Sequence, residues 1–187
     1  PVSVGLAIVG RCTDDDFPEG LADSKQLTAR ARTGLVDPLR DWLVDSAVAH
    51  ASPAEIDEHG IVGALRLAGL RALQRVADWL TVPQPDLLTA LEAQPALTAP
   101  GPAADSPTPL VRMEVKADAR CAVVAAASVL AKVERDSLMI DLADPGYGWA
   151  SNKGYASPAH IKGLADLGAS DQHRHSWHLP GLDRHHG

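Results

Sequence analysis

The stretch that most constrains the fold of this chain is a run of small residues at positions 121–132, Cys-Ala-Val-Val-Ala-Ala-Ala-Ser-Val-Leu-Ala-Lys. Such a run favours a helix, because alanine has the highest helix propensity. Its small side chains also allow the helix to approach a β-sheet closely. Only 4% of the residues are aromatic, so the core is expected to consist of alanine, leucine and valine. The run therefore predicts a helix packed tightly against a sheet.

The composition is typical of one soluble globular domain. The 187 residues are enough to bury a core, and 45% of them are hydrophobic. The formal net charge is −7, from 17 Lys and Arg against 24 Asp and Glu. This balance argues against a generally basic nucleic-acid-binding surface. It is compatible with a local basic groove, or with a metal site where carboxylates gather around a cation.

The two cysteines and the hydropathy indicate a cytoplasmic protein. Cys12 and Cys121 form neither a disulfide framework nor a zinc pair, which fits a reducing compartment. Cys121 lies in the predicted helix and is expected to be a buried, inert thiol. No apolar run is long enough to span a membrane.

Strand-like and helix-like segments alternate along the chain. Val2–Val9 is apolar on both faces and predicts a buried strand. Thr28 is placed to cap a helix over 29–44, and Ser52-Pro53-Ala54-Glu55 has the form of a capping box. The alternation indicates an α/β protein with mixed strands. The other expected elements are strands at 46–51, 86–91 and 110–115, and helices at 61–80, within 118–141 and at 158–167.

Asp118 is the main candidate for chemistry. It stands between a strand-like run and the alanine-rich helix, with Lys116 two residues before it. A carboxylate at such a junction is well placed to hold a divalent metal, and nearby lysines can face an anionic substrate. The pattern therefore indicates phosphodiester chemistry. The alternative is that Asp118 is a helix N-cap.

Other polar residues have competing interpretations. Lys25 either contacts phosphate or is a solvated surface lysine, and Ser24 belongs to the same motif or is a local turn residue. Arg135 and Asp136 are neighbours on the helix, so each is expected to pair elsewhere and, with Lys132, to have a structural role. The histidines of the tail are expected to be mobile and solvated, because no cysteine or carboxylate cluster accompanies them. They are His173, His175, His178, His185 and His186.

Five motifs, in the same order along the chain, resemble the ribonuclease HII family. Together they extend over nearly the whole chain, and the order makes the match specific although each motif alone is weak. They are Asp23-Ser24-Lys25-Gln26-Leu27; Pro53-Ala54-Glu55-Ile56-Asp57; Lys116-Ala117-Asp118 followed by 125–136; Pro145-Gly146-Tyr147-Gly148 with Asn152-Lys153-Gly154-Tyr155; and His173-Arg174-His175-Ser176-Trp177.

The resemblance implies an α/β ribonuclease H-like fold, a five-stranded mixed sheet flanked by helices. It implies a domain over residues 1–143 and a C-terminal extension over 144–187. The implied activity is endonucleolytic cutting of RNA in RNA–DNA hybrids, including 5′ of single ribonucleotides in duplex DNA. Two manganese or magnesium ions (Mn2+ or Mg2+), about 4 Å apart and held by four carboxylates, would support it. We expect a monomer without membrane contact.

By the same resemblance, Asp118 is a catalytic metal ligand. The implied substrate-binding residues are Ser24, Lys25, Lys116, Lys153 and Tyr155. Tyr155 resembles the family tyrosine that packs on the sugar at the ribonucleotide–DNA junction, and its alternative is a half-buried loop tyrosine. Asn152 stands where many relatives have histidine.

The acidic set of the family is incomplete in this sequence. An Asp-Glu pair and a Gly-Arg-Gly loop precede the family's Gly-Pro-Val strand, and Pro1 lies within that strand. We expect an upstream segment to supply this pair and the first, central strand of the sheet. At the third acidic position the chain has Leu91. Glu92 is adjacent, but a one-residue shift in a strand reverses its face, and a short deletion over 86–92 is the other explanation.

Two alternative functions remain open at this point. A degenerate relative would bind hybrid nucleic acid without cleaving it, which would follow if the Asp-Glu pair is truly lacking and Leu91 is a real loss. A scaffold protein would use the alanine-rich helix for protein contacts.

Overall fold

A two-stranded antiparallel sheet lies at the centre of the protein. The computed structural model describes residues 1–76 and 115–182. Strands β1 (Val2–Ile8) and β2 (Asp45–Ala51) pair so that the first residue of β1 lies opposite the last residue of β2. The strands expected at 2–9 and 46–51 are thus confirmed. The strands expected at 86–91 and 110–115 lie outside the described residues, except for position 115.

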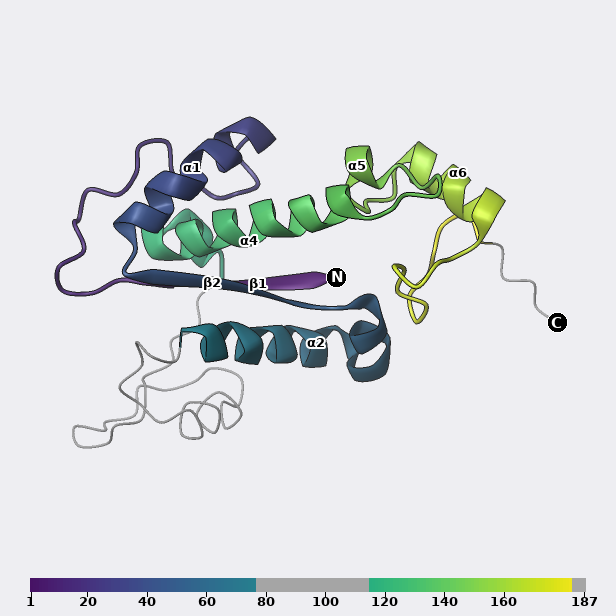
Figure 1. Cartoon of the computed structure of the whole chain (residues 1–187), viewed down its shortest axis with the longest axis horizontal. Coiled ribbons are helices and arrows are strands. Elements are labelled where there is room, and N and C mark those ends of the chain that lie inside the picture. The colour runs from purple at the N-terminus through teal and green to yellow at the C-terminus, as the bar shows by residue number, and fades with distance from the viewer. Residues whose placement is uncertain (77–114, 183–187) are drawn as a thin grey trace.

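Helices cover both faces of this sheet (Figure 1). Helix α2 packs against one face and α4 against the other, and α1 packs on α4 through Leu35 and Leu39. The helices are α1 (Ala29–Trp42), α2 (Pro53–Arg75), the 3-10 turn η2 (Ala117–Ala119), α4 (Ala122–Asp141), α5 (Trp149–Asn152) and α6 (Pro158–Leu167). The described part is therefore α/β, and a five-stranded sheet stays a prediction.

The alternation of side chains along β1 decides which helix covers which face. Val2, Val4, Leu6 and Ile8 pack on the α2 side of the sheet. The intervening small residues face α4, where Ala7 joins the cluster around Leu39 and Val129 of α1 and α4. This period of two is what a strand between two helical layers requires.

Strand β1 approaches α4 very closely at Gly5. A Cβ atom at Gly5 would lie only 2.3 Å from the carbonyl oxygen of Ala127. The strand backbone therefore rests almost directly on the helix backbone. Glycine at this position and alanine around 127 make that distance possible, as the small-residue run predicts.

Local capping chemistry fixes the helix starts. Thr28 accepts the Ala31 N–H at the start of α1, and Ser52 and Glu55 form the reciprocal capping box of α2. Gly60 breaks α2 with φ 69°, which explains why the sequence pattern predicts a helix only from position 61. The end predicted at 80 lies outside the described residues. Arg71 reaches back to the carboxylate of Glu55 across this break.

One expectation about the central helix is wrong. Cys121 is exposed, because α4 begins at Ala122 and the cysteine is the residue that precedes it. A residue before the first turn lies outside the buried face of the helix.

The Gly- and Tyr-containing sequence over 144–157 predicts a loop. In the structure this stretch also includes a short helix, α5, which begins after Gly148, a residue in the left-handed conformation.

The C-terminal segment up to residue 182 packs against the end of α4, although His175 and His178 are exposed as expected. The Tyr147 and Trp149 rings are stacked and, with Met139 and Leu164, form a separate core cluster beyond the end of α4. His173 is buried against this cluster, so the expectation of a solvated tail is wrong for that residue. His185 and His186 lie outside the described residues.

Asp57 connects α2 to this segment. Its carboxylate accepts the backbone N–H groups of His175 and Ser176 and the Ser176 hydroxyl. These donors, led by the Ser176 hydroxyl, lower the pKa of Asp57. Among the residues described, no helix is long and apolar enough to cross a membrane.

Substitution of Gly5 by alanine should destabilise the protein by about 1–3 kcal/mol, because the added methyl group is forced into the Ala127 carbonyl. Gly69→Ala is the matched control: nothing lies within 4 Å of its added Cβ, and the helix interior favours alanine by about 1 kcal/mol. Urea unfolding measures both effects. An unchanged midpoint for Gly5→Ala would contradict the close contact.

Candidate active site

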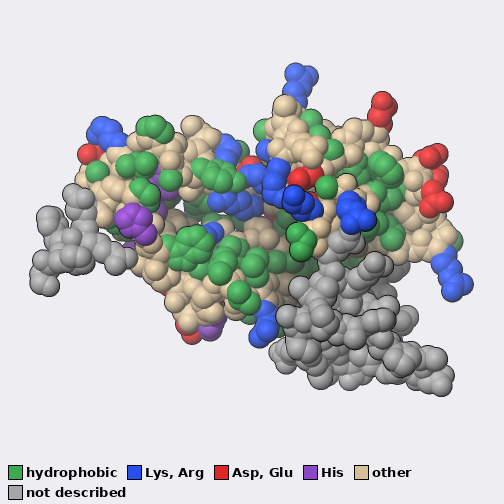
Figure 2. Space-filling view, turned by 180° about the vertical axis from the view of Figure 1, so that it is seen from behind, with side chains coloured by type: hydrophobic (Ala, Val, Ile, Leu, Met, Phe, Trp, Pro, Cys, Tyr) green, Lys and Arg blue, Asp and Glu red, His purple; other side chains and the backbone are tan. Residues whose placement is uncertain are grey.

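A cleft of about 510 Å³ lies where β1, α4 and the turn before α4 meet. Its floor includes Gly5 and Ala127, so the close backbone contact sets its depth. Figure 2 shows Lys and Arg side chains gathered beside a hollow on one face of the molecule. The charged residues that line the cleft are Lys116, Asp118, Lys132 and Arg135.

Asp118 lies in this cleft on the 3-10 turn η2. The residue preceding α4 is Cys121 and not Asp118, so the interpretation of Asp118 as the helix N-cap is wrong. Its side chain is 18% exposed, and its Oδ2 accepts a hydrogen bond of 3.2 Å from Lys25 Nζ. The hydrogen bond to Asp118 and then the charges of Asp118 and Asp23 raise the pKa of Lys25. The Lys25 side chain is otherwise exposed.

The Asp-Ser-Lys turn is held against α4 by buried polar contacts. Ser24 is buried, and its hydroxyl lies 2.7 Å from the hydroxyl of Ser128 on α4. The Arg32 guanidinium donates to the carbonyl oxygens of Ser24 and Leu27, at 2.8 and 2.6 Å. These contacts place Lys25 opposite Asp118. Ser24 is thus a positioning group within the cleft wall.

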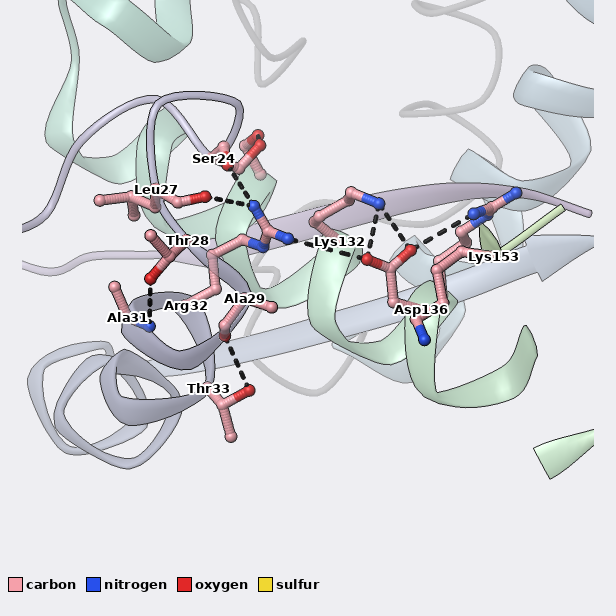
Figure 3. Close-up of polar contacts among 12 residues, drawn as sticks. Ser24, Leu27, Thr28, Ala29, Ala31, Arg32, Thr33, Lys132, Asp136 and Lys153 are labelled. Atoms are coloured by element: carbon pink, nitrogen blue, oxygen red, sulfur yellow. Dashed lines mark hydrogen bonds and ion pairs between the residues drawn. The ribbon is translucent and has the colours of Figure 1, made fainter. Parts of the chain in front are cut away.

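Asp136 organises the basic residues along α4 (Figure 3). Its carboxylate accepts from Lys132 at 2.5 and 2.6 Å and from Arg135 at 3.3 Å, and Arg32 Nη2 lies 3.8 Å away. The expectation that Arg135 and Asp136 each pair elsewhere is confirmed for Asp136, which pairs with Lys132 and Arg32. It is wrong for Arg135, whose long guanidinium side chain bends back to its neighbour. One carboxylate here faces three cations, so the cluster keeps a net positive charge.

Tyr155 stands beside this cluster. The residue is 63% exposed, with Lys132 Nζ 5.4 Å and the Arg135 guanidinium carbon 5.6 Å from the ring centre. Such distances are those of cation–π contacts. Since Lys132 and Arg135 also line the cleft, the tyrosine ring lies at its border. The ring is therefore exposed rather than a half-buried loop side chain.

The remaining candidates differ in position. Lys116 lines the cleft next to Asp118 and has a left-handed backbone with φ 58°. Lys153 is not among the lining residues, and its ammonium group donates to the Ala150 carbonyl. Asn152 bonds the Tyr147 carbonyl and the Gly154 N–H, which is a structural role. Glu92 and Leu91 lie outside the described residues.

Among the described residues, the cleft can supply one carboxylate ligand to a divalent cation. Asp118 is the only carboxylate that the described residues contribute to the cleft lining. Within the same residues no group of three or more His, Cys, Asp or Glu side chains could hold a metal. Magnesium and manganese prefer about six oxygen ligands. Asp118 is suited to supply one of them, and the described part supplies no complete shell.

The sequence did not reveal two parts of this site. Arg32 lies one helical turn after the capping residue Thr28, and its side chain points back to the loop that precedes α1. No sequence motif identifies it. Lys132 and Arg135 were expected to be structural. They both pair with Asp136 and line the cleft.

Known proteins resemble this chain over most of its length. The family model described as Ribonuclease HII matches residues 1–179. Proteins named ribonuclease HII from Streptomyces avermitilis and Streptomyces coelicolor are 42% and 43% identical to it, and each comparison covers 95% of this chain and 70% of the relative. The ribonuclease HII of Roseobacter denitrificans is 40% identical over 87% of this chain and 76% of its own length.

Asp136→Asn should lower the free energy of unfolding by about 1–3 kcal/mol, because three cations lose a partly buried counter-charge. The control is Asp166→Asn, which removes the exposed pair with Lys162 on α6 and should cost less than about 0.5 kcal/mol. Chemical denaturation compares the two variants. Equal effects would show that the Asp136 cluster contributes nothing beyond a surface ion pair.

Proposed function

The chain belongs to the ribonuclease HII family, and from this we propose that the cleft at Asp118 is where it binds and cuts its substrate. The protein is an endoribonuclease that acts on RNA–DNA hybrids, and a metal-dependent hydrolase. Identity of 42% over 95% of the chain does not favour a non-cleaving relative. The observation that carries the proposal is the meeting of Asp118, Lys25 and three further cations in one cleft.

The finer activity we propose is nicking on the 5′ side of a ribonucleotide in duplex DNA. Asp118 would serve as one oxygen ligand of Mn2+ or Mg2+, and the short turn η2 holds its carboxylate at the cleft. Bound cations of this kind activate water for attack on phosphorus and stabilise the leaving oxygen. Glu92 stays a sequence-based candidate for a further ligand.

Lys25 has two partners in this proposal. Its ammonium group is held by Asp118 in the structure, and its side chain is 78% exposed. If Asp118 held a cation, its carboxylate would no longer be free to pair with Lys25, and the exposed ammonium group could then contact a substrate phosphate. Ser24 and Arg32 keep the turn in place while this exchange occurs.

Local charge explains how an acidic protein can hold nucleic acid. The whole chain carries a formal charge of −7. In the cleft lining, Asp118 is outnumbered by Lys116, Lys132 and Arg135. Charges further away than a Debye length of about 8 Å are screened at physiological salt. The backbone of the substrate therefore meets a positive surface. We assign Lys153 to the outer border of this surface.

Tyr155 supplies the non-ionic contact in the proposal. Its exposed ring, already flanked by Lys132 and Arg135, offers a flat face to the sugar at the ribonucleotide–DNA junction. An aromatic ring that packs on a sugar responds to the shape of the sugar and makes no contact with the base. The enzyme would then recognise where the ribonucleotide lies without preference for its base. We propose that one monomer suffices for this contact.

Asp118→Asn should reduce nicking of a duplex with one embedded ribonucleotide by at least about a hundredfold with either metal, since the amide weakens the metal site. Binding of the duplex without metal should be retained. The control is Asp166→Asn, a substitution at an exposed residue, and this variant should cleave the duplex at the normal rate. Cleavage by Asp118→Asn at the control rate would overturn the assignment of Asp118.

Tyr155→Ala should raise KM for the ribonucleotide-containing duplex about two- to tenfold, from the loss of a ring contact, with a smaller change in kcat. Tyr155→Phe keeps the ring and should behave like the unmodified protein. Steady-state nicking assays separate the two constants. An equal defect in Tyr155→Phe and Tyr155→Ala would show that the hydroxyl, and not the ring face, makes the contact.

A further inference from the structure

A pair of buried histidines lies behind Tyr155. His160 on α6 is 7% exposed and His173 in the C-terminal segment is 5% exposed. Their Nε2 atoms are 3.0 Å apart, a hydrogen-bond distance between two groups that are thirteen residues apart in sequence. The other ring nitrogen of His160, Nδ1, lies 2.9 Å from the backbone carbonyl oxygen of Tyr155. The pair thus joins the C-terminal segment to the tyrosine proposed to contact substrate.

The neighbouring groups determine where each proton sits. The Ser170 backbone N–H donates to His173 Nδ1 at 3.0 Å, and the Ser170 hydroxyl lies at the same distance and can also donate. The Ser170 carbonyl, which could only accept from this nitrogen, is further away at 3.3 Å. We therefore assign Nδ1 as an acceptor and the proton of the neutral ring to Nε2. His173 Nε2–H then donates to His160 Nε2. That leaves the His160 proton on Nδ1, where it donates to the Tyr155 carbonyl. The hydrogen bonds run in one direction from Ser170 to Tyr155.

A second proton on His160 Nε2 would face the Nε2–H of His173. A second proton on His173 Nδ1 would face the Ser170 N–H and would have the Ser170 carbonyl, 3.3 Å away, as its acceptor. Burial lowers the pKa of His173; the backbone contact with Ser170 opposes this, and the charges of His160 and His175 lower it further. The net lowering agrees with a neutral ring.

The surroundings of the pair are both aromatic and basic. Tyr147 and Trp149 pack against the His173 ring and bring no charge. His175 Nε2 lies 3.2 Å from the Ser170 carbonyl. The other charged or titratable groups that line the same pocket as the pair are the Pro1 amino group, Arg135, Arg174 and His178.

The Tyr155 backbone has few other attachments. Its carbonyl also accepts the Ser157 N–H, and its own N–H donates to the Asn152 carbonyl. The side chain is held by Lys132 and Arg135 through its ring face. His160 is the link that connects this segment to the buried interior of the C-terminal cluster. A shift of the carbonyl would move the ring relative to the two cations.

We propose that His160 and His173 are positioning residues that hold the Tyr155 backbone, and with it the ring, at the cleft. The inference rests on the proposed function of Tyr155 as a substrate contact. It adds to that function two buried residues that do not touch the substrate themselves and that act through the Tyr155 carbonyl.

The proton positions are tested directly by NMR on the ¹⁵N-labelled full chain at neutral pH. The expected spectra show a proton on Nδ1 of His160 and on Nε2 of His173. The opposite forms, or two charged rings, would overturn the hydrogen-bond direction. This measurement does not depend on enzymatic activity, so its outcome is separate from that of the proposed function.

The link to the substrate is tested with variants at position 160. His160→Leu removes the donor to Tyr155 and should raise KM for the ribonucleotide-containing duplex about two- to tenfold, with kcat nearly unchanged. His160→Asn can place an amide N–H where Nδ1 lies, and should restore most of the lost affinity. His59→Leu, at an exposed histidine of α2, is the control. Thermal melting confirms that each variant is folded.

A double-mutant cycle distinguishes positioning from a general structural role. In a Tyr155→Ala background, His160→Leu should add no further increase in KM. Additive effects would overturn the proposal. If Tyr155→Ala has no effect, the proposed function of Tyr155 fails; if only His160→Leu has none, this inference fails. If His160→Leu does not fold, His173→Gln and the NMR spectra decide.

Discussion

The backbone contact between Gly5 and Ala127 is the constraint on which the rest of this structure depends. It sets the distance between β1 and α4, and therefore the floor of the cleft. Lys132 and Arg135 follow on the same helix and line the cleft because the helix lies so close to the strand. A larger residue at position 5 would lift the helix and the whole basic row with it. The contact between Gly5 and Ala127 thus determines both the packing of α4 on β1 and the position of the basic residues in the cleft.

Charge is arranged in two linked groups. Asp118 is joined to Lys25, and Asp136 is joined to Lys132, Arg135 and Arg32. The first pair is half exposed to solvent through Lys25 and can be exchanged for other partners. The second group is more enclosed and keeps an excess of positive charge. One group is therefore suited to change during turnover, while the other is suited to stay fixed.

Local signals in the sequence predicted the elements well, and contacts between distant residues were not predictable. The caps at Thr28 and Ser52 are short-range patterns, and both are found in the structure. The exposure of Cys121 was missed because a shift of one residue at a helix start changes a side chain's surroundings. The burial of His173 depends on α6 and the aromatic cluster, which no local pattern encodes. The family motifs identified Asp118, while its contact with Lys25, 93 residues away, required the structure.

The hydrogen bonds between Asp57 and Ser176 affect the order in which parts of the chain fold. These residues are 119 positions apart, so most of the chain must be synthesised before they can meet. Contacts of such sequence separation form late and slow the folding reaction. The pairing of β1 with β2 and the packing of α2 on them use shorter-range contacts and can form before then, whereas α4 meets β1 across a comparably long separation, at Gly5 and Ala127. We expect the packing of the C-terminal segment, which carries Tyr155, to be the last folding event. A nascent chain would then become compact before it is able to bind substrate.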